Sequence, residues 1–176
     1  MMDSRAREER DSRLDGLSRM LGQRFKRAEA EEIQAFFEQF YARVPAEDVN
    51  EASPENLYGA ALSLWKFAAQ RAAGEVKLRV YNPRMEEHGW NSSHTIVEIV
   101  ADDMPFLVDS VTGNLNQWGC PVHLAIHPVV RRRRDDQAPR QELMPPASNG
   151  EVGISEAAMH TQMAERSDDA ALANIP

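Results

Sequence analysis

The pattern of apolar and polar residues is clearest between residues 92 and 134, where it predicts a strand, a helix and a second strand. Thr95 to Val100 (TIVEIV) is β-branched and almost wholly apolar, which is typical of an interior strand covered on both faces. Apolar residues then recur at three- and four-residue steps, which predicts an amphipathic helix that begins at about Met104. Its predicted buried stripe is Val108, Val111, Leu115 and Trp118, and its predicted solvent-facing residues are Asp109, Asn114, Asn116 and Gln117. From Val122 the period changes to two, so a second strand follows and the unit is βαβ.

An acidic turn joins the first of these strands to the helix. Asp102 and Asp103 are predicted to cap the helix, because a carboxylate accepts hydrogen bonds from the free amides of a first turn. Pro105 suits the same turn, since its missing N–H is not needed there. Gly119 and Pro121 are predicted to end the helix.

The chain before this unit is predicted to be helical. Residues 1–27 mix charges densely, which indicates a flexible or partner-dependent helix. Residues 28–74 predict a helical hairpin, whose second helix is opened by Ser53 and Pro54 and closed by Gly74. The first helix of the hairpin has an aromatic and apolar stripe made of Ile33, Phe36, Phe37, Phe40 and Tyr41. This stripe either belongs to the core, which we prefer, or docks on another subunit or domain.

Residues 75–176 are predicted to form the sheet-and-helix part of an α+β fold. Val76 to Tyr81 alternate as a short strand, which we expect to pair with the free edge of the Thr95–Val100 strand. Residues 135–150 have the Pro, Gly and polar content of a flexible connection. Glu156 to Ala164 fits a helix or a strand, and we choose a third strand. Ser167 to Asp169 look like a helix start close to Pro176, so we expect the chain to be a fragment of a longer protein.

Composition narrows the classes of partner and compartment. The net charge is −8 and the isoelectric point is near 5.2, which argues against nucleic acid or an anionic membrane as the main partner. No apolar run approaches the roughly 20 residues that cross a bilayer. A single cysteine suits a reducing compartment, so we expect a cytoplasmic protein.

The sequence lacks the glycine motifs of nucleotide sites. Its nine glycines never form the GxGxxG turn that lets a backbone approach a pyrophosphate, and there is no GxxxxGK loop. We therefore expect neither a bound cofactor nor a catalytic residue in this segment.

Other reactive side chains have structural interpretations that we favour over chemical ones. In a strand, His123 and His127 would lie about 13 Å apart, too far to share a zinc ion. His88 and His94 flank Trp90, and with Glu86 and Glu87 they would make either a site or, in the preferred interpretation, an anchor for their loop. Cys120 near His123 is interpreted as a buried small residue at a strand start rather than a nucleophile. The acidic side chains Asp102, Asp103 and Asp109 are interpreted as capping and solvated groups rather than an acid–base pair or metal site, and Arg131 to Arg134 as a solvated strand end.

Four motifs, RVYNP, EEHGW, DDMPFLVDSV and HLAIHPV, give the chain a specific resemblance. Together with YGAALSLWKFAAQR, they cover about two thirds of the chain, which resembles the amino-terminal region of the large bacterial NAD-dependent glutamate dehydrogenases. That region resembles an ACT-like module, a ferredoxin-like βαββαβ unit that lies ahead of the catalytic and NAD-binding domains. The resemblance thus implies a βαββ module that is incomplete at its carboxyl end.

The resemblance also implies a function. The family oxidises L-glutamate to 2-oxoglutarate and ammonia with NAD, and this segment would contribute regulation or assembly without a cofactor or metal of its own. Its partners would be the rest of the dehydrogenase chain, further copies in a homo-oligomer and an amino-acid effector. The turn expected to face an effector is Asp102, Asp103, Met104, Pro105 and Phe106, with Asn114 and Trp118 near an interface. Amino-acid-binding ACT modules usually carry glycine where Phe106 stands. The alternative is a stand-alone amino-acid sensor or interaction module without catalysis.

Overall fold

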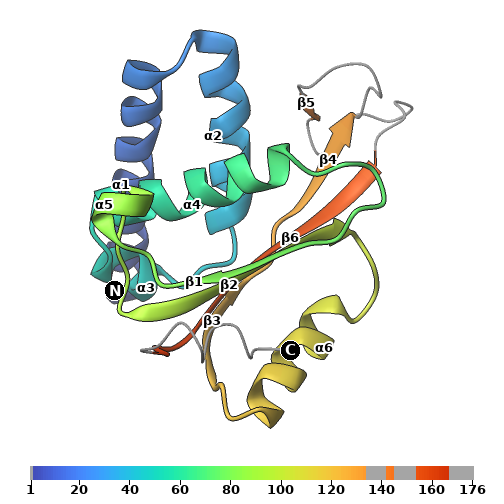
Figure 1. The fold of residues 1–176 in the computed structure, drawn as a ribbon. Helices are drawn as coiled ribbons and strands as arrows, with labels where there is room; N and C mark the ends of the chain where they lie inside the picture. The colour runs from blue at the N-terminus through green and yellow to red at the C-terminus, as the bar shows by residue number, and fades with distance from the viewer. Residues whose placement is uncertain (1, 134–141, 145–153, 167–176) are drawn as a thin grey trace.

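Figure 1 shows the computed structural model of the chain, in which a group of helices lies on one face of an antiparallel sheet and α6 lies on the other. The structure describes residues 2–133, 142–144 and 154–166. The predicted helix start at Ser167 to Asp169 and most of the predicted connection at 135–150 lie outside these residues.

The helices are α1 Met2–Arg24, α2 Arg27–Tyr41, α3 Ala46–Glu51, α4 Pro54–Ala69, α5 Met85–His88 and α6 Leu107–Gln117. The strands are β1 Lys77–Tyr81, β2 His94–Asp102, β3 Val122–Ile126, β4 Val129–Arg133, β5 Glu142–Met144 and β6 Ile154–Ala164. Two short helices, α3 and α5, occupy connections for which we predicted none. Among the described residues, no helix has the length and apolar content needed to cross a membrane.

β6, the strand predicted at residues 156–164, is the central strand of the sheet. The strand order is β1-β2-β6-β4-β5, β3 also pairs with β6, and every pairing is antiparallel. β6 runs beside β2 along its whole length, from His94 opposite Ala164 to Asp102 opposite Glu156. The choice of a strand for residues 156–164 is therefore confirmed. The order β2, α6, β3 and β6 also confirms the α+β, ACT-like βαββ arrangement.

β1 occupies the outer edge of β2, as predicted for Val76 to Tyr81. Lys77 pairs opposite Val100 and Tyr81 opposite Ile96. On the other side of β6, the strand that begins at Val122 is interrupted at His127 and Pro128 before β4 continues beside β6. Proline lacks the N–H that a ladder requires, but the Pro128 carbonyl still accepts a hydrogen bond from the Ala158 amide at 3.0 Å.

The helical layer encloses the larger core. α1 and α2 lie side by side and α4 runs across the sheet beneath them (Figure 1). The predicted aromatic stripe of α2 is buried, so its assignment to the core is confirmed. The amino-terminal segment, for which we predicted a flexible or partner-dependent helix, is α1, and its Leu17 and Leu21 are buried in this same core. Ser53 caps α4 as predicted, since its hydroxyl accepts a hydrogen bond from the Asn56 amide at 3.2 Å.

The start of α6 differs from the prediction. The helix begins at Leu107 rather than Met104, and no side chain caps it. Asp102 is the last residue of β2, and the Asp103 amide donates to the Ser155 carbonyl at 2.9 Å, so the chain stays with the sheet for longer than expected. Phe106 then turns the chain with a left-handed φ of 63°. The capping role predicted for Asp102 and Asp103 is wrong.

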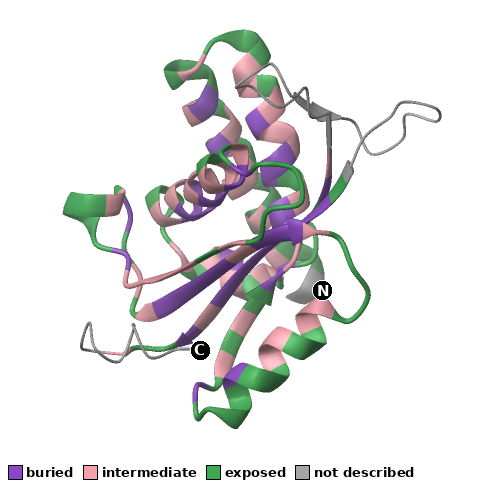
Figure 2. Ribbon diagram, turned by 45° about the vertical axis from the view of Figure 1, so that its right-hand side comes forward, coloured by how far each residue is buried: buried purple, intermediate pink, exposed green. Residues whose placement is uncertain are grey.

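α6 covers the second face of the sheet with one side only. Leu115 is buried with Val97, Cys120 and Met163, and Val111 packs against them, as the stripe predicted. Trp118 is the exception, because it follows the last helical residue and is 44% exposed. The predicted solvent-facing residues of α6 are all exposed. Figure 2 shows the contrast between the buried central strands and the exposed outer side of α6.

Candidate functional site

Two candidate sites lie at opposite ends of β2. The predicted turn follows Asp102 at the carboxyl end of the strand, and a cavity adjoins His94 at its amino end. The turn was predicted from the sequence, whereas the cavity was not.

The turn is an exposed, largely apolar surface. Met104 is 48% exposed and Phe106 is 75% exposed, and Asp103 and Pro105 are also exposed. Of the two residues expected near an interface, Trp118 is exposed, and Asn114 donates its side-chain amide to the Ser110 carbonyl at 2.7 Å. These residues remain available for contact with another molecule or chain segment.

Asp102 pairs with a buried arginine. Arg71 Nη2 lies 2.5 Å from Asp102 Oδ1, and Arg71 Nη1 lies 2.8 Å from Glu156 Oε1. The side chains of Arg71 and Glu156 are both 0% exposed. Arg71 follows α4, so this cluster ties the helical layer to the neighbouring strands β2 and β6. Asp102 therefore has a structural partner, which the sequence did not reveal.

A second buried polar cluster centres on Glu98. Its carboxylate lies 2.8 Å from His160 Nδ1 and accepts a hydrogen bond from Arg79 Nε at 2.6 Å. Arg79 also donates to the Ser63 carbonyl of α4 at 3.1 Å. Burial, with Glu98 nearby, raises the pKa of Tyr81 well above its usual range. Glu98 interrupts the apolar run TIVEIV, and that interruption was the available sequence signal for this cluster.

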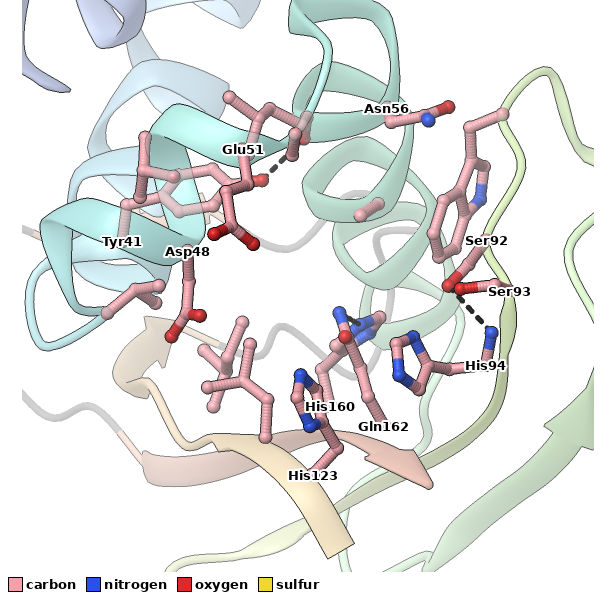
Figure 3. Close-up of a pocket in the computed structure, with 18 of the residues that line it drawn as sticks. Tyr41, Asp48, Glu51, Asn56, Ser92, Ser93, His94, His123, His160 and Gln162 are labelled. Carbon is pink, nitrogen blue, oxygen red and sulfur yellow. Dashed lines mark hydrogen bonds between the residues drawn. The ribbon is translucent and has the colours of Figure 1, made fainter. Parts of the chain in front are cut away.

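The cavity lies between the helical layer and the ends of β2, β3 and β6, and it has a volume of about 650 Å³ (Figure 3). This is within the range of small-molecule sites. Its apolar wall is formed by Phe40, Tyr41, Val44, Val49, Ala52, Leu57, Ala60, Trp90, Leu124 and Ile126. Its polar lining is formed by Asp48, Glu51, Asn56, Asn91, Ser92, Ser93, His94, His123, His160, Gln162 and Glu165.

Several cavity side chains are already fixed by internal hydrogen bonds. The Tyr41 hydroxyl donates to the Leu57 carbonyl at 2.6 Å, and burial raises the pKa of Tyr41 well above its usual range. Asn56 and Asn91 hold each other, since Asn56 Nδ2 donates to Asn91 Oδ1 at 2.9 Å and the Asn91 amide donates to Asn56 Oδ1 at 3.0 Å. These bonds fix the aromatic wall and one polar corner of the cavity before any ligand arrives.

Histidines meet at the floor of the cavity in a pairing that the sequence did not predict. The rings of His94 and His123 stack at a centroid distance of 4.7 Å and an interplanar angle of 11°. Burial, and then the neighbouring His123, lower the pKa of His94, which favours its neutral form at pH 7. His88 instead receives a hydrogen bond from the Arg84 amide at 3.1 Å, which confirms the loop-anchoring interpretation for this residue.

The lowered pKa of His94 predicts a pH dependence of stability. His94 binds a proton more readily in the unfolded chain than in the folded chain. Neutral His94 therefore contributes to the free energy of unfolding above the unfolded-state pKa of 6.5, and this contribution is lost as the pH falls below that pKa. We expect the melting temperature to fall between pH 7.5 and pH 5.5 and His94→Gln to reduce that fall. His127, whose pKa is lowered mainly by burial, should act in the same direction. Thermal unfolding of His94→Gln and of the unsubstituted chain across this range tests the assignment, and equal slopes would contradict it.

The remaining sequence candidates occupy structural positions. Cys120 is 4% exposed in the cluster under α6, which confirms its interpretation as a buried small residue, and Arg166 Nη2 lies 3.1 Å from its sulfur. Arg131 to Arg133 belong to β4, and Arg134 lies outside the described residues. The described residues contain no group of three His, Cys, Asp or Glu side chains arranged to hold a metal ion.

The cavity does not fit NAD. Among the described residues that line it there is no lysine or arginine, and a pyrophosphate would face the carboxylates of Asp48, Glu51 and Glu165. The geometry therefore defines a class: an ACT-like α+β module with a cavity where its helical layer meets the sheet, and with an exposed turn at the other end of β2.

Comparison with known proteins identifies the family. A model of the family described as "Glutamate dehydrogenase, ACT1 domain" matches residues 36–176, and the chain belongs to this family. It is 38% identical over 168 residues to an NAD-specific glutamate dehydrogenase of Halomonas elongata, covering 94% of this chain and 10% of that protein. It is 33% identical over 132 residues to an NAD-specific glutamate dehydrogenase of Pseudomonas aeruginosa, covering 75% of this chain and 8% of that protein. The chain thus spans about a tenth of the length of these relatives. No solved structure matches it.

Proposed function

We propose that this chain is a non-catalytic regulatory and assembly segment of an NAD-dependent glutamate dehydrogenase. The complete enzyme would oxidise L-glutamate to 2-oxoglutarate and ammonia, and NAD would bind outside this segment. The observation that carries the proposal is the 38% identity along 94% of the chain to a small part of a much longer dehydrogenase. The cavity supports the same conclusion, because its described lining residues include no lysine or arginine for a pyrophosphate.

The surface proposed for assembly is the turn after β2 together with the end of α6. Met104, Phe106 and Trp118 are large apolar side chains that remain exposed there. Exposed large apolar side chains at both ends of α6 are candidates for contact with another polypeptide. Because relatives have about ten times the length of this chain, the proposed occupant is the remainder of the dehydrogenase polypeptide. Contact with a second copy of the segment would be a different outcome of the same experiment.

The test is a pair of substitutions in the complete dehydrogenase. Phe106→Ser and Trp118→Ser remove apolar area without disturbing the cores, since both side chains are exposed. We expect the double variant to change the native mass, the response to amino-acid effectors, or both. Light scattering measures the mass, and NADH formation measures the response. Cross-linking followed by mass spectrometry distinguishes contacts within one polypeptide from contacts between copies.

Met85→Ser is the matched control, because Met85 in α5 is similarly exposed, at 46%, but lies outside the turn and α6. Met85→Ser should change neither the native mass nor the effector response. If the double variant also retained the native mass and effector response of the unsubstituted enzyme, the proposed contact surface would be wrong.

The competing function is a stand-alone small-molecule sensor, which the cavity would also suit. The length of the reading frame that encodes this chain separates the two. A product of dehydrogenase length that forms NADH from glutamate supports the first function, and a product confined to this segment supports the second.

A further inference from the structure

We propose that the cavity between α3, α4 and the ends of β2, β3 and β6 binds a small organic cation with an aliphatic body and a primary ammonium group. This assigns a ligand class to a site that is distinct from the turn after β2. It does not depend on whether the segment regulates a dehydrogenase.

The described lining of the cavity carries negative charge. Asp48, Glu51 and Glu165 contribute three carboxylates, and no lysine or arginine lies among the described lining residues. Figure 3 shows the side chains of Asp48 and Glu51 on one side of the open space, across from Ser92 and Ser93. Neither carboxylate makes an ion pair within the described part of the chain, although acidic side chains elsewhere on this protein do. The cavity therefore offers uncompensated negative charge to a ligand.

The cavity also has an aromatic wall that suits the aliphatic body of such a ligand. Phe40 and Trp90 are almost fully buried and line the cavity, and Tyr41 packs edge-on against Phe40 at a centroid distance of 4.8 Å with its hydroxyl bonded to the Leu57 carbonyl. Apolar and aromatic surfaces hold the methylene groups of a ligand, and ring faces attract a cation. A compact inorganic ion would leave this wall unused, whereas an aliphatic ammonium ion contacts both kinds of lining.

The lining opposes an anionic ligand. His160 lines the cavity and its Nδ1 is held 2.8 Å from the Glu98 carboxylate, while Gln162 Nε2 lies 3.5 Å from His160 Nε2. The carboxylates of Asp48, Glu51 and Glu165 would repel an anion that enters. Amino acids with net negative charge, such as glutamate, and nucleotides therefore fit this lining poorly.

The position of the cavity predicts a consequence of binding. Its lining comes from α2, α3 and α4 on one side and from β2, β3 and β6 on the other, so a bound cation contacts both layers. A ligand that binds only the folded arrangement stabilises it in proportion to its saturation. Binding should therefore raise the melting temperature of the chain.

The test is isothermal titration of the 176-residue chain with cadaverine, a five-carbon diamine, with pentanol, glutamate and AMP as comparison probes. We expect cadaverine to bind, to bind more weakly at high salt, and to raise the melting temperature, with no comparable binding of the other three. Each substitution removes a carboxylate that can accept a charge-assisted hydrogen bond from the ammonium group, so the double variant Asp48→Asn with Glu51→Gln should bind cadaverine at least about tenfold more weakly.

Glu47→Gln provides the matched control, since Glu47 is an exposed acidic residue of the same helix α3 that does not line the cavity. It should leave the affinity within about twofold of the unsubstituted chain, which excludes a general loss of surface charge as the cause. Circular dichroism of each variant shows that it is folded. Absence of cadaverine binding, or binding that the Asp48 and Glu51 substitutions leave unchanged, would overturn the proposal.

Discussion

Replacing Arg71 by methionine is expected to lower the free energy of unfolding by about 3–5 kcal/mol. Arg71 is fully buried and its guanidinium pairs with Glu156, also fully buried, and with Asp102. Methionine keeps much of the side-chain volume but leaves the Glu156 carboxylate buried without this partner. Because the three residues join α4 to β2 and β6, the loss should loosen the attachment of the helical layer to the sheet. Urea unfolding followed by circular dichroism measures the change.

An exposed arginine provides the control for that substitution. Arg27 pairs with Glu31 at 2.9 Å, but its side chain is 93% exposed, so Arg27→Met should change stability by no more than about 0.5 kcal/mol. A second variant that combines Arg71→Met with Glu156→Leu also removes the buried carboxylate and should recover part of the lost stability. Equal effects of Arg71→Met and Arg27→Met would show that the buried cluster does not hold the two layers together.

The second large effect is expected at Gly59, where a single added methyl group should destabilise the chain by about 1–3 kcal/mol. A Cβ atom at this position in α4 would lie 2.3 Å from Trp90 Cβ and 2.7 Å from Trp90 Cγ. These are atoms close to the backbone of a buried residue, so they cannot move aside cheaply. Gly59→Ala should also displace Trp90 from the cavity wall, which tryptophan fluorescence will report beside the unfolding curve.

Gly113 is the matched comparison because it is also a helical glycine, in α6, and has no atom within 4 Å of an added Cβ. Gly113→Ala should stabilise the chain by about 0.5–1 kcal/mol, since alanine favours a helix more than glycine does. Opposite signs for the two substitutions are the expected result. If Gly59→Ala were also stabilising, the close approach of α4 to Trp90 would be wrong.

The elements that the sequence predicted well are those with a continuous apolar period. The aromatic stripe of α2 and the β-branched run of β2 each bury the side chains that their spacing indicated. The alternation in β1 predicted the strand correctly, but Leu78 is 54% exposed there. The predicted edge pairing of β1 with β2 followed from the need to cover a free strand edge. For these segments, local periodicity and tertiary packing favour the same structure.

The turn after β2 was predicted less well because two interpretations of its aspartates compete. An Asp before an apolar helical stripe is a typical cap, but Asp102 pairs with Arg71, which is 31 residues earlier in the chain. A partner so distant leaves no local pattern. Phe106 adopts a left-handed conformation that its residue type disfavours, so helix propensity alone placed the start of α6 too early.

The cavity was not predicted because its residues have no common period or motif. Asp48 and Glu51 lie in a segment predicted as a connection, His123 in a strand and Gln162 near the end of the last strand. Only the antiparallel pairing of β6 with both β2 and β3 brings His94 and His123 together. The site therefore depends on the strand pairing of the sheet, which could be predicted from the sequence only in part.

The non-catalytic role of this segment is tested by comparing the turnover of the complete dehydrogenase with that of the same enzyme lacking residues 1–176, at equal concentrations of folded chain. We expect glutamate-dependent NADH formation to survive the deletion to within about tenfold, and the native mass or effector response to change. Complete loss of hydride transfer in a folded deletion variant that retains its native assembly would contradict this role, because the segment would then belong to the catalytic machinery.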